Sequence, residues 1–343
     1  MVSRVTIYDI AREAKVGIGT VSRVLNNHPN VTPETRRRVM EIIKRLHYQP
    51  HTYAQRLARR NAETISAIIP FFSTYFFAEV LHGVQDRISE LGYDLVLYGV
   101  NHADQVESHI NRTLRRGKVD GILFFSMRLP PGSLPRLKES KLPVVLVDTS
   151  IPEFDSISVA NSEGAYVAVK HLIQLGHRSV GLINAQPTSI PAMERLEGYR
   201  RALYEQGLPI SDEMVKTGNN TKFDGFNREA GYEAMVEFIK MGEEMPKAFF
   251  VSSDIQALGA IEALNDNEFR VPGDAAIVGF DDIELASLFK LTTMRQPMYQ
   301  MGSLAVERLV KRMSSPDMEI LHTKFSPTLI VRESCGALRR SED

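Results

Sequence analysis

The stretch that decides the N-terminal fold is Gly17–Val39, GIGTVSRVLNNHPNVTPETRRRV, which is basic and poor in bulky apolar residues. On a helix that turns 100° per residue, residues 18–25 separate into two faces. One face carries the residues that can pack on neighbouring helices, Thr20, Val21, Val24 and Leu25. The opposite face carries Ile18, Gly19, Ser22 and Arg23. A slim face with one arginine and one hydroxyl fits the major groove of DNA, which is about 12 Å wide.

Two further helices are predicted around this segment. One begins at Thr6, with Asp9 three positions later, an acidic variant of the capping box. The other begins with Thr32 and Pro33, a helix cap followed by proline at the first helical position. Two helices joined by a tight turn at residues 15–17 form a helix-turn-helix. The alternative is a three-helix bundle without a nucleic-acid role, which would not need the exposed face.

The charge is distributed unevenly along the 343 residues. Residues 1–60 carry twelve Lys/Arg against four Asp/Glu, a net charge of +8, whereas the remainder carries 29 against 38. The two parts nearly cancel in the formal net charge of −1. A basic head on an acidic body predicts that the head binds a polyanion. The alternative is a solvated helical surface.

Length and composition limit the class of protein. The chain is long enough for two or three domains. It has no run of eighteen apolar residues, and its N-terminus lacks an apolar signal-peptide core, so we expect a cytoplasmic protein without a membrane segment. The single cysteine, Cys335, excludes an intramolecular disulfide framework and zinc-finger spacing.

From residue 64 onward, apolar runs of strand length alternate with amphipathic helical stretches. The runs form two sets, TISAIIP, YDLVLYGV, VDGILFF and PVVLVD, then SVGLINA, MVKTGN, KAFFVS and AAIVGF. The alternation predicts an α/β fold with parallel sheets flanked by helices, and the two sets predict two lobes. Ligands of such folds bind at the carboxyl ends of the strands. We therefore expect a site in the cleft between the lobes.

Catalytic signatures are missing from the sequence. It contains no glycine-rich phosphate loop, no nucleophile elbow and no HExxH zinc motif. The nine histidines show no spacing typical of metal ligands. We expect neither an enzyme nor a cofactor or metal site.

The chain resembles the LacI/GalR family of transcription regulators over essentially its whole length. The resemblance rests on the order and spacing of TIYDIAREAKVGIGTVSRVLNNHPNVTPETRRRVMEIIKRLHYQPHTYAQRLA, LGHRSVGLI, RLEGYRRAL, SDIQALGAIEAL, VGFDDIELA and LTTMRQPMYQMGSLAVERL. It implies a helix-turn-helix DNA-binding domain at residues 1–49, a hinge helix or linker at 50–61 and a two-lobed core at 62–343. The core would be periplasmic-binding-protein-like, bind an effector and form a homodimer. Its first lobe is expected at 62–159 and 292–322, and its second lobe at 160–291 and 323–343.

The resemblance also implies which residues contact a pseudo-palindromic operator. Base edges would be read by Ile18, Gly19, Ser22 and Arg23. Phosphates would be contacted by Asn26, Thr32 and Tyr48. Leu57, in the hinge segment, matches the leucine that wedges into the minor groove. Residues 51–59 are too few for a stable isolated helix, so the alternative for this segment is a basic linker.

Several charged residues stand at predicted strand ends or helix starts. The resemblance implies that the effector contacts are Asp148, Arg195, Phe226, Ser253 and Asp281. A forked arginine and carboxylates suit sugar hydroxyls, which both donate and accept. The alternatives are a helix cap for Asp148 and a place in the core for Phe226, and for the neighbouring Asp254 we expect the helix-cap role.

The first lobe departs from the family pattern in ways that bear on the effector. Phe71 and Ala160 stand where relatives often have aspartate, and Tyr75 replaces a proline. The mouth of the cleft should therefore be more aromatic. We expect a transcription regulator, specifically a repressor, controlled by a sugar or sugar derivative. The alternatives are a purine-like or other small effector, or a binding protein of transport type, against which the basic head argues.

Overall fold

The computed structural model of the chain describes residues 5–25, 28–48, 62–71, 73–100, 103–115, 118–130 and 132–337. It divides into two compact units, Met1–Glu63 with Arg116–Asp120, and Thr64–Arg115 with Gly121–Asp343. The expected hinge segment at 50–61, with Leu57, lies outside the described residues, as does Asn26. No helix in the described part is long and apolar enough to span a membrane.

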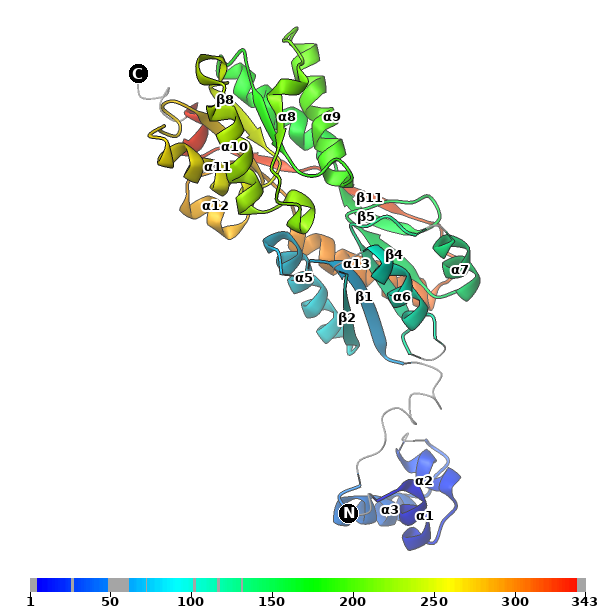
Figure 1. Cartoon of the computed structure of the whole chain (residues 1–343). Helices are drawn as coiled ribbons and strands as arrows, with labels where there is room; N and C mark the ends of the chain where they lie inside the picture. Colours follow the sequence, from blue (N-terminus) through cyan, green and yellow to red (C-terminus); the bar gives the residue numbers. More distant parts are fainter. Residues whose placement is uncertain are drawn as a thin grey trace. The chain divides into compact units, whose positions relative to one another are not determined.

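The N-terminal unit contains the three expected helices (Figure 1). They are α1 (Ile7–Ala14), α2 (Ile18–Leu25) and α3 (Pro33–Arg45). All three bury apolar side chains in one small core, formed by Ile10, Ala11, Ala14, Val21, Val24, Val39, Ile42 and Tyr48. The apolar face predicted for α2 is therefore the face that packs.

Local signals place the ends of these helices. The Asp9 carboxylate accepts hydrogen bonds from the Thr6 backbone N–H over 2.9 Å and from the Thr6 hydroxyl over 2.7 Å. The Thr32 hydroxyl accepts from the Thr35 N–H over 3.3 Å, which caps α3. Lys15 adopts φ 51° after α1, which turns the chain into α2.

The described part of the first lobe holds a six-stranded parallel sheet in the order β11-β5-β4-β3-β1-β2. Its strands are β1 (Thr64–Pro70), β2 (Asp94–Val100), β3 (Gly121–Phe125), β4 (Val144–Val147), β5 (Asp155–Val159) and β11 (His322–Phe325). Strand β1 lies between β2 and β3, and its register pairs Ile65 with Leu95 on one side and with Gly121 on the other. The four strands predicted from the first set of apolar runs are confirmed.

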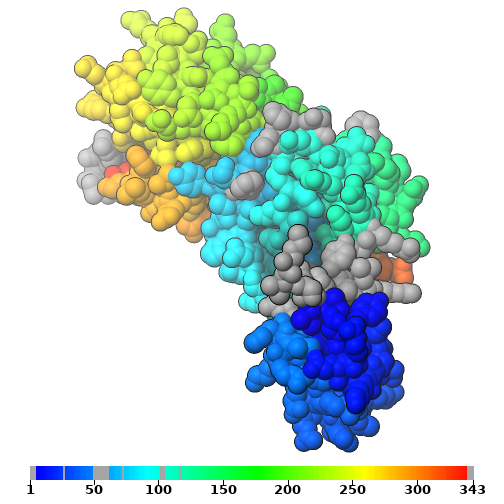
Figure 2. All heavy atoms as spheres, turned by 60° about the horizontal axis from the view of Figure 1, so that its bottom comes forward, coloured from blue at the N-terminus to red at the C-terminus, as the bar shows by residue number. Residues whose placement is uncertain are grey.

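Helices cover both faces of this sheet. They are α5 (Tyr75–Leu91) and α13 (Met298–Ser314) on one face, and α6 (Ala103–Thr113) and α7 (Ser133–Ser140) on the other. Alternate residues of β1 serve the two sides: Ile65 and Ile69 join the α5–α13 core, and Ile68 joins the α6–α7 core. This two-sided burial explains why the strands read as continuous apolar runs. In Figure 2 the orange atoms of the chain entering α13 lie beside the light-blue atoms of α5.

The second lobe repeats the plan with one exception. Its described sheet has the order β12-β10-β9-β8-β6-β7. The strands are β6 (Gly181–Asn184), β7 (Val215–Thr217), β8 (Ala248–Val251), β9 (Ala276–Asp281), β10 (Thr292–Arg295) and β12 (Thr328–Ile330). All neighbours are parallel, as predicted, except β10 and β12, which are antiparallel. Strand β12 is antiparallel because the chain arrives directly from the carboxyl end of β11 in the first lobe.

Helices again flank the second sheet on both faces. One face is covered by α8 (Asn161–Gln174) and α9 (Ile190–Glu205), and the other by α10 (Arg228–Ile239) and α11 (Asp254–Asp266). The short elements are η1 (Asp212–Met214), η2 (Lys222–Gly225), η3 (Gly242–Glu244), α12 (Glu284–Leu288) and η4 (Glu333–Cys335). Of these, η2 and α12 contribute residues to the cleft described below.

The described chain crosses between the lobes at Ala160, at residues 296–297 and at residues 326–327. The expected boundaries at 292 and 323 are wrong, because β10 (Thr292–Arg295) pairs with β9 of the second lobe and β11 pairs with β5 of the first. The later crossings therefore follow Arg295 and Phe325.

A buried ion cluster braces the first lobe at the sheet edge. Asp155 is 1% exposed and accepts hydrogen bonds from Arg308 over 2.7 Å and from Arg312 over 2.8 Å. The Leu321 N–H donates to the same carboxylate over 2.8 Å. Burial acts to raise the pKa of Asp155, but these donors outweigh it and hold the pKa below its usual value. The cluster ties β5 to α13 and to the segment that leads into β11.

Candidate functional site

The exposed face of α2 has the composition expected of a groove reader. Ile18 is 41% exposed, Gly19 and Arg23 are exposed, and Ser22 is half-buried, whereas Val21 and Val24 are buried. The Arg23 Nε atom donates to the Gly19 carbonyl oxygen over 3.1 Å. The guanidinium therefore lies along its own helix, where its remaining N–H groups can meet a base edge.

Two of the expected phosphate contacts also have structural roles in this unit. Tyr48 is 8% exposed and belongs to the apolar core, and burial raises the pKa of its hydroxyl. Thr32 caps α3. Their contacts with phosphate stay predictions.

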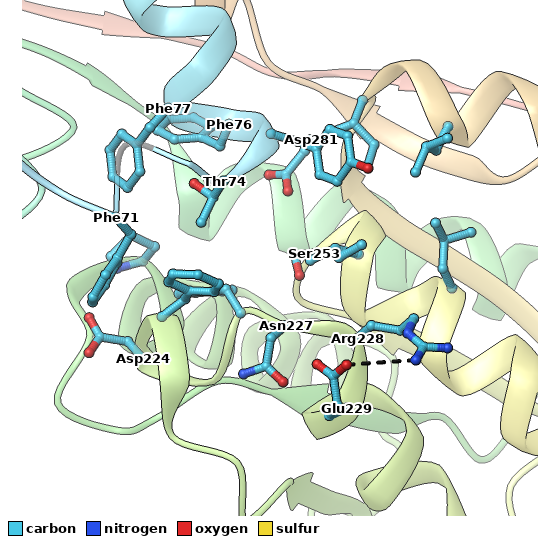
Figure 3. A pocket seen from close by; sticks show the side chains of 18 of the residues that line it. Phe71, Thr74, Phe76, Phe77, Asp224, Asn227, Arg228, Glu229, Ser253 and Asp281 are labelled. Carbon is cyan, nitrogen blue, oxygen red and sulfur yellow. Dashed lines mark ion pairs between the residues drawn. The ribbon is translucent and has the colours of Figure 1, made fainter. Parts of the chain in front are cut away.

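The two lobes enclose a cavity of about 820 Å³ at the carboxyl ends of their strands. All five residues predicted to contact the effector line it, namely Asp148, Arg195, Phe226, Ser253 and Asp281. They come from loops and helices that are far apart in the sequence. Figure 3 shows Asp281 and Ser253 between an aromatic end and a charged end of this cavity.

Asp148 and Ser126 form a polar pair on the first-lobe side. Each follows the last residue of a strand, β4 and β3, and the Ser126 hydroxyl donates to the Asp148 carboxylate over 2.6 Å. Both residues have positive φ, 42° for Ser126 and 57° for Asp148. Such strained backbone is typical of binding sites, where the surrounding structure holds it. Burial raises the pKa of Asp148 to about 6, against the lowering effects of Ser126 and Arg195.

Arg195 forms the cationic centre of the cavity and is 4% exposed. Its Nε donates to Asn161 over 3.0 Å, and its Nη1 donates to the Ser252 carbonyl. The guanidinium carbon lies 3.8 Å from the centroid of the Phe280 ring and 5.7 Å from that of Phe226. Stacking on one ring and bonding to the backbone hold the guanidinium plane in one orientation.

Asp281 ends β9 and faces this arginine. Its Oδ1 lies 3.9 Å from Arg195 Nη1, and the Gln296 amide donates to the same oxygen over 2.6 Å. Burial raises the pKa of Asp281 to about 7, while Arg195 and Gln296 act in the opposite direction. A carboxyl with this pKa can donate or accept a hydrogen bond near neutral pH.

Ser253, rather than Asp254, caps α11, so the cap role expected for Asp254 is wrong. The Ser253 hydroxyl accepts from the Gln256 N–H over 3.4 Å and donates to the Gln256 side chain over 3.0 Å. Asp254 is the first helical residue and is fully buried. Its carboxylate accepts from the Thr293 hydroxyl and from the Ile283 N–H, and so ties α11 to β10 and to the loop after β9.

Sequence reasoning missed several residues that line or support the cavity. Ser126, Phe223 and Asp224 line it, and Gln296 supports Asp281 from the crossover after β10. The strand-end rule that identified Asp148 could have identified Ser126, which follows GILFF. Phe223 and Asp224 lie in η2, which carries no strand or helix pattern.

The chemistry of the lining favours binding over catalysis. The described lining includes aromatic rings, carboxylates, two arginines and hydroxyls, but no histidine, cysteine or lysine. The Ser126 hydroxyl donates to the Asp148 carboxylate and the Ser253 hydroxyl to the Gln256 side chain, and the lining pairs neither serine with a histidine or a lysine. The arrangement can hold a polyhydroxylated molecule through paired donors and acceptors.

A two-lobed ligand-binding core that follows a helix-turn-helix unit defines a class of ligand-controlled DNA-binding proteins. Residues 6–51 match the family described as bacterial regulatory proteins, lacI family, and residues 169–335 match a periplasmic binding protein-like domain. The chain is 36% identical to catabolite control protein A of Priestia megaterium, over 92% of this chain and 94% of that protein.

Solved structures extend the match to the fold. The lac repressor dimer bound to operator and the anti-inducer ONPF has a TM-score of 0.83 at 25% identity, covering 97% of this chain and 99% of that one. The transcriptional regulator CelR–cellobiose complex has a TM-score of 0.72 at 30% identity, covering 96% and 100%. The chain belongs to the LacI family of bacterial regulatory proteins. It is an effector-responsive, DNA-binding transcription regulator, and the expectation that it is not an enzyme is confirmed by these relatives.

Proposed function

We propose that this protein represses transcription from a pseudo-palindromic operator, as a homodimer, under the control of a sugar or sugar derivative bound between its lobes. The observation that carries the proposal is the convergence of five effector-contact candidates on one cavity, which both lobes line. The relatives support it, because one is a lac repressor dimer bound to operator and another is a regulator bound to cellobiose. A repressor of this kind works in the cytoplasm.

The polar groups of the cavity support a sugar ligand. The carboxyl groups of Asp148 and Asp281 both lie close enough to Arg195 to act on its pKa, so adjacent sugar hydroxyls can donate to a carboxylate and accept from the guanidinium. Phe226 offers a ring face for the C–H side of a pyranose. Ser253 adds a hydroxyl from the start of α11. In this proposal these five residues are the effector contacts.

The DNA-binding function is assigned to residues 1–49 and the switch to residues 50–61, with residues 62–343 as the effector-binding and dimerising core. Base reading is assigned to α2 through Ile18, Gly19, Ser22 and Arg23, and phosphate contacts to Asn26, Thr32 and Tyr48. The net charge of +8 over residues 1–60 supports this assignment. Leu57 would wedge into the minor groove at the centre of the operator.

The test selects genomic fragments with the full-length protein and then adds sugars. We expect the protein to retain a few fragments at moderate salt and to change its affinity for them when one sugar is added. Asp281→Asn should abolish the sugar response and leave fragment binding intact, while Asp212→Asn, on the exposed surface, should change neither. Failure to retain any fragment at low salt would contradict the regulator function. A response to purines but not sugars would contradict only the effector class.

A further inference from the structure

Phe71 and Phe223 meet across the cleft from opposite lobes. Their ring centroids are 5.2 Å apart and their planes are inclined at 69°. Phe71 follows β1 of the first lobe, whereas Phe223 lies in η2 of the second. Both line the same cavity as Asp148 and Asp281. The pair is thus a direct contact between the lobes at one end of the ligand cavity.

Both rings project from left-handed backbone. The φ angle is 50° at Phe71 and 57° at Phe223, and Asp224 follows with 55°. Bulky residues rarely adopt this conformation, because their side chains clash with the neighbouring backbone. Strain of this kind persists only where the surroundings enforce it, and it concentrates at sites that hold ligands.

Hydrogen bonds hold the η2 loop in this conformation. The Asn227 amide donates to the Lys222 carbonyl over 2.6 Å, and its oxygen accepts from the Ala230 N–H over 2.8 Å. The same side chain therefore fixes the loop and caps α10. The Gln186 N–H donates to the Asp224 carbonyl over 2.8 Å. The direction of the Phe223 ring is set by these bonds.

The charges around the cavity disfavour an anionic ligand. Its lining contains six carboxylates, Asp148, Asp224, Glu229, Glu262, Asp266 and Asp281, against two arginines. Both arginines are engaged: Arg228 pairs with Glu262 over 2.5 Å and with Glu229 over 3.7 Å, and Arg195 bonds to Asn161 and Ser252. A phosphate would meet more carboxyl groups than arginines in this lining, and each arginine already holds other groups.

Asp224 and Phe71 face the same part of the cavity, at the end away from the Arg228–Glu229 pair (Figure 3). The Asp224 carboxylate makes no hydrogen bond or ion pair with another residue of the described chain. An aromatic ring beside a carboxylate can contact the C–H face of a sugar and accept its hydroxyl hydrogens. A cavity of about 820 Å³ also lies in the upper part of the usual range for ligand pockets, roughly 300–1,000 Å³.

Resting on the sugar-binding function proposed above, we propose that Phe71, Phe223 and Asp224 form a second subsite for the outer ring of an uncharged two-ring ligand. The inner ring lies among Asp148, Arg195 and Asp281. The two phenylalanines contact the outer ring of the ligand from opposite lobes. The chemistry of that outer ring therefore determines which ligands bind tightly. The protein therefore prefers two-ring molecules to single sugars and rejects phosphorylated sugars.

Calorimetry on the full-length protein tests this with matched probes. The single-ring probes are glucose and N-acetylglucosamine, and the two-ring probes are cellobiose, maltose, chitobiose and phenyl β-glucoside. Glucose 6-phosphate probes the charge. We expect at least one two-ring probe to bind tenfold or more tighter than its single-ring counterpart, and glucose 6-phosphate to bind no tighter than glucose.

Substitutions test whether the preference for two-ring probes comes from the proposed second subsite. Phe71→Leu and Phe223→Leu keep an apolar side chain on the same backbone, and each should reduce the two-ring preference at least fivefold while single-ring affinity stays within twofold. Tyr204→Leu, at a side chain 78% exposed on α9, is the control and should change nothing. Asp224→Asn should weaken disaccharides but not phenyl β-glucoside if the outer ring is a sugar, and should leave both unchanged if it is an aryl group. Melting temperatures show that each variant is folded.

The outcomes separate the two proposals. If single-ring sugars bind and Asp281→Asn abolishes that binding, but two-ring probes bind no tighter, the second subsite is wrong and the effector site stands. Unchanged preference in both phenylalanine variants overturns the subsite in the same way. If no sugar of either size binds, the sugar effector and the second subsite are both overturned. Tighter binding of glucose 6-phosphate than glucose contradicts the argument from charge.

Discussion

The Gln296 amide donates a hydrogen bond to Asp281 Oδ1 over 2.6 Å, which joins the crossover between the lobes to the floor of the cavity. Gln296 is 3% exposed, and its Oε1 has no hydrogen-bond partner among the described residues. The Gln296 amide nitrogen therefore donates a hydrogen bond to Asp281, whereas the amide oxygen accepts none within the described chain. Gln296 is a positioning residue for a proposed effector contact.

Gln296→Met should weaken effector binding and have little effect on stability. Asp281 would lose the donor that orients it, which costs about 1.5–3 kcal/mol for a charged acceptor, or roughly tenfold or more in affinity. The free energy of unfolding should change little, because the substitution also removes a buried oxygen without a partner. Calorimetry with the effector sugar and urea unfolding measure the two effects. Gln206→Met, at an exposed position after α9, is the control, and equal affinity in both variants would contradict the positioning role.

Stability should depend on pH through Asp281. Its pKa is raised to about 7 in the folded protein, so between about pH 4 and 7 the folded state binds more protons than the unfolded state. The contribution of this group to the free energy of unfolding therefore falls as the pH rises through that window. Asp148, with a pKa of about 6, acts in the same direction over a narrower window.

The Asp281→Asn variant has no titratable group at this position, so it tests whether Asp281 causes the pH dependence of stability. From pH 5 to pH 8 its free energy of unfolding should rise relative to the natural protein by more than about 1.4 kcal/mol, the equivalent of one pKa unit. Urea unfolding at both pH values measures the difference. Asp212→Asn, at an exposed ion pair, should show a constant difference. A constant difference for Asp281→Asn as well would mean that this carboxyl titrates normally.

The Asp155 cluster should contribute strongly to the stability of the first lobe. Asp155→Asn would leave Arg308 and Arg312 beside a neutral group in a buried setting, and loss of one partner of a buried ion pair typically costs about 3–5 kcal/mol. Because the pKa of Asp155 is held below its usual value, its contribution should be lost only as the pH falls into the acidic range. Breaking the exposed Arg200–Asp212 pair should cost less than about 1 kcal/mol. Thermal unfolding measures the difference, and similar melting temperatures for Asp155→Asn and Asp212→Asn would show that the cluster is not stabilising.

Arg23→Ala should reduce sequence discrimination more than nonspecific DNA binding. One arginine contact to a base is worth about 1–3 kcal/mol of discrimination, whereas phosphate contacts act on every sequence alike. Gel shifts with the selected fragment and with random DNA, over a range of salt concentrations, give both affinities. Arg200→Ala, in the second lobe, is the control and should bind like the natural protein. Equal losses on both DNAs would assign Arg23 to phosphate contact.

The sequence by itself determined the elements and their order. Apolar runs such as TISAIIP read as strands because a parallel sheet buries both of its faces, and Thr32-Pro33 marked a helix start because cap chemistry is local. Asp148 and Asp281 could be placed at one cleft because the carboxyl ends of parallel strands share an edge. These inferences need only neighbours in the chain or a general rule of topology.

Tertiary structure alone decided which sheet β10 and β11 join, because the sequence of a strand does not identify the strand with which it pairs. It also decided that Ser253 rather than Asp254 caps α11, since Asp254 is drawn inward by Thr293, distant in sequence. Phe71 and Phe223 are separated by much of the chain, and nothing local to either predicts their contact. The left-handed backbone that points both rings across the cleft is imposed by packing and by bonds such as Asn227 to Lys222, so the aromatic end of the ligand cavity exists only in the folded chain.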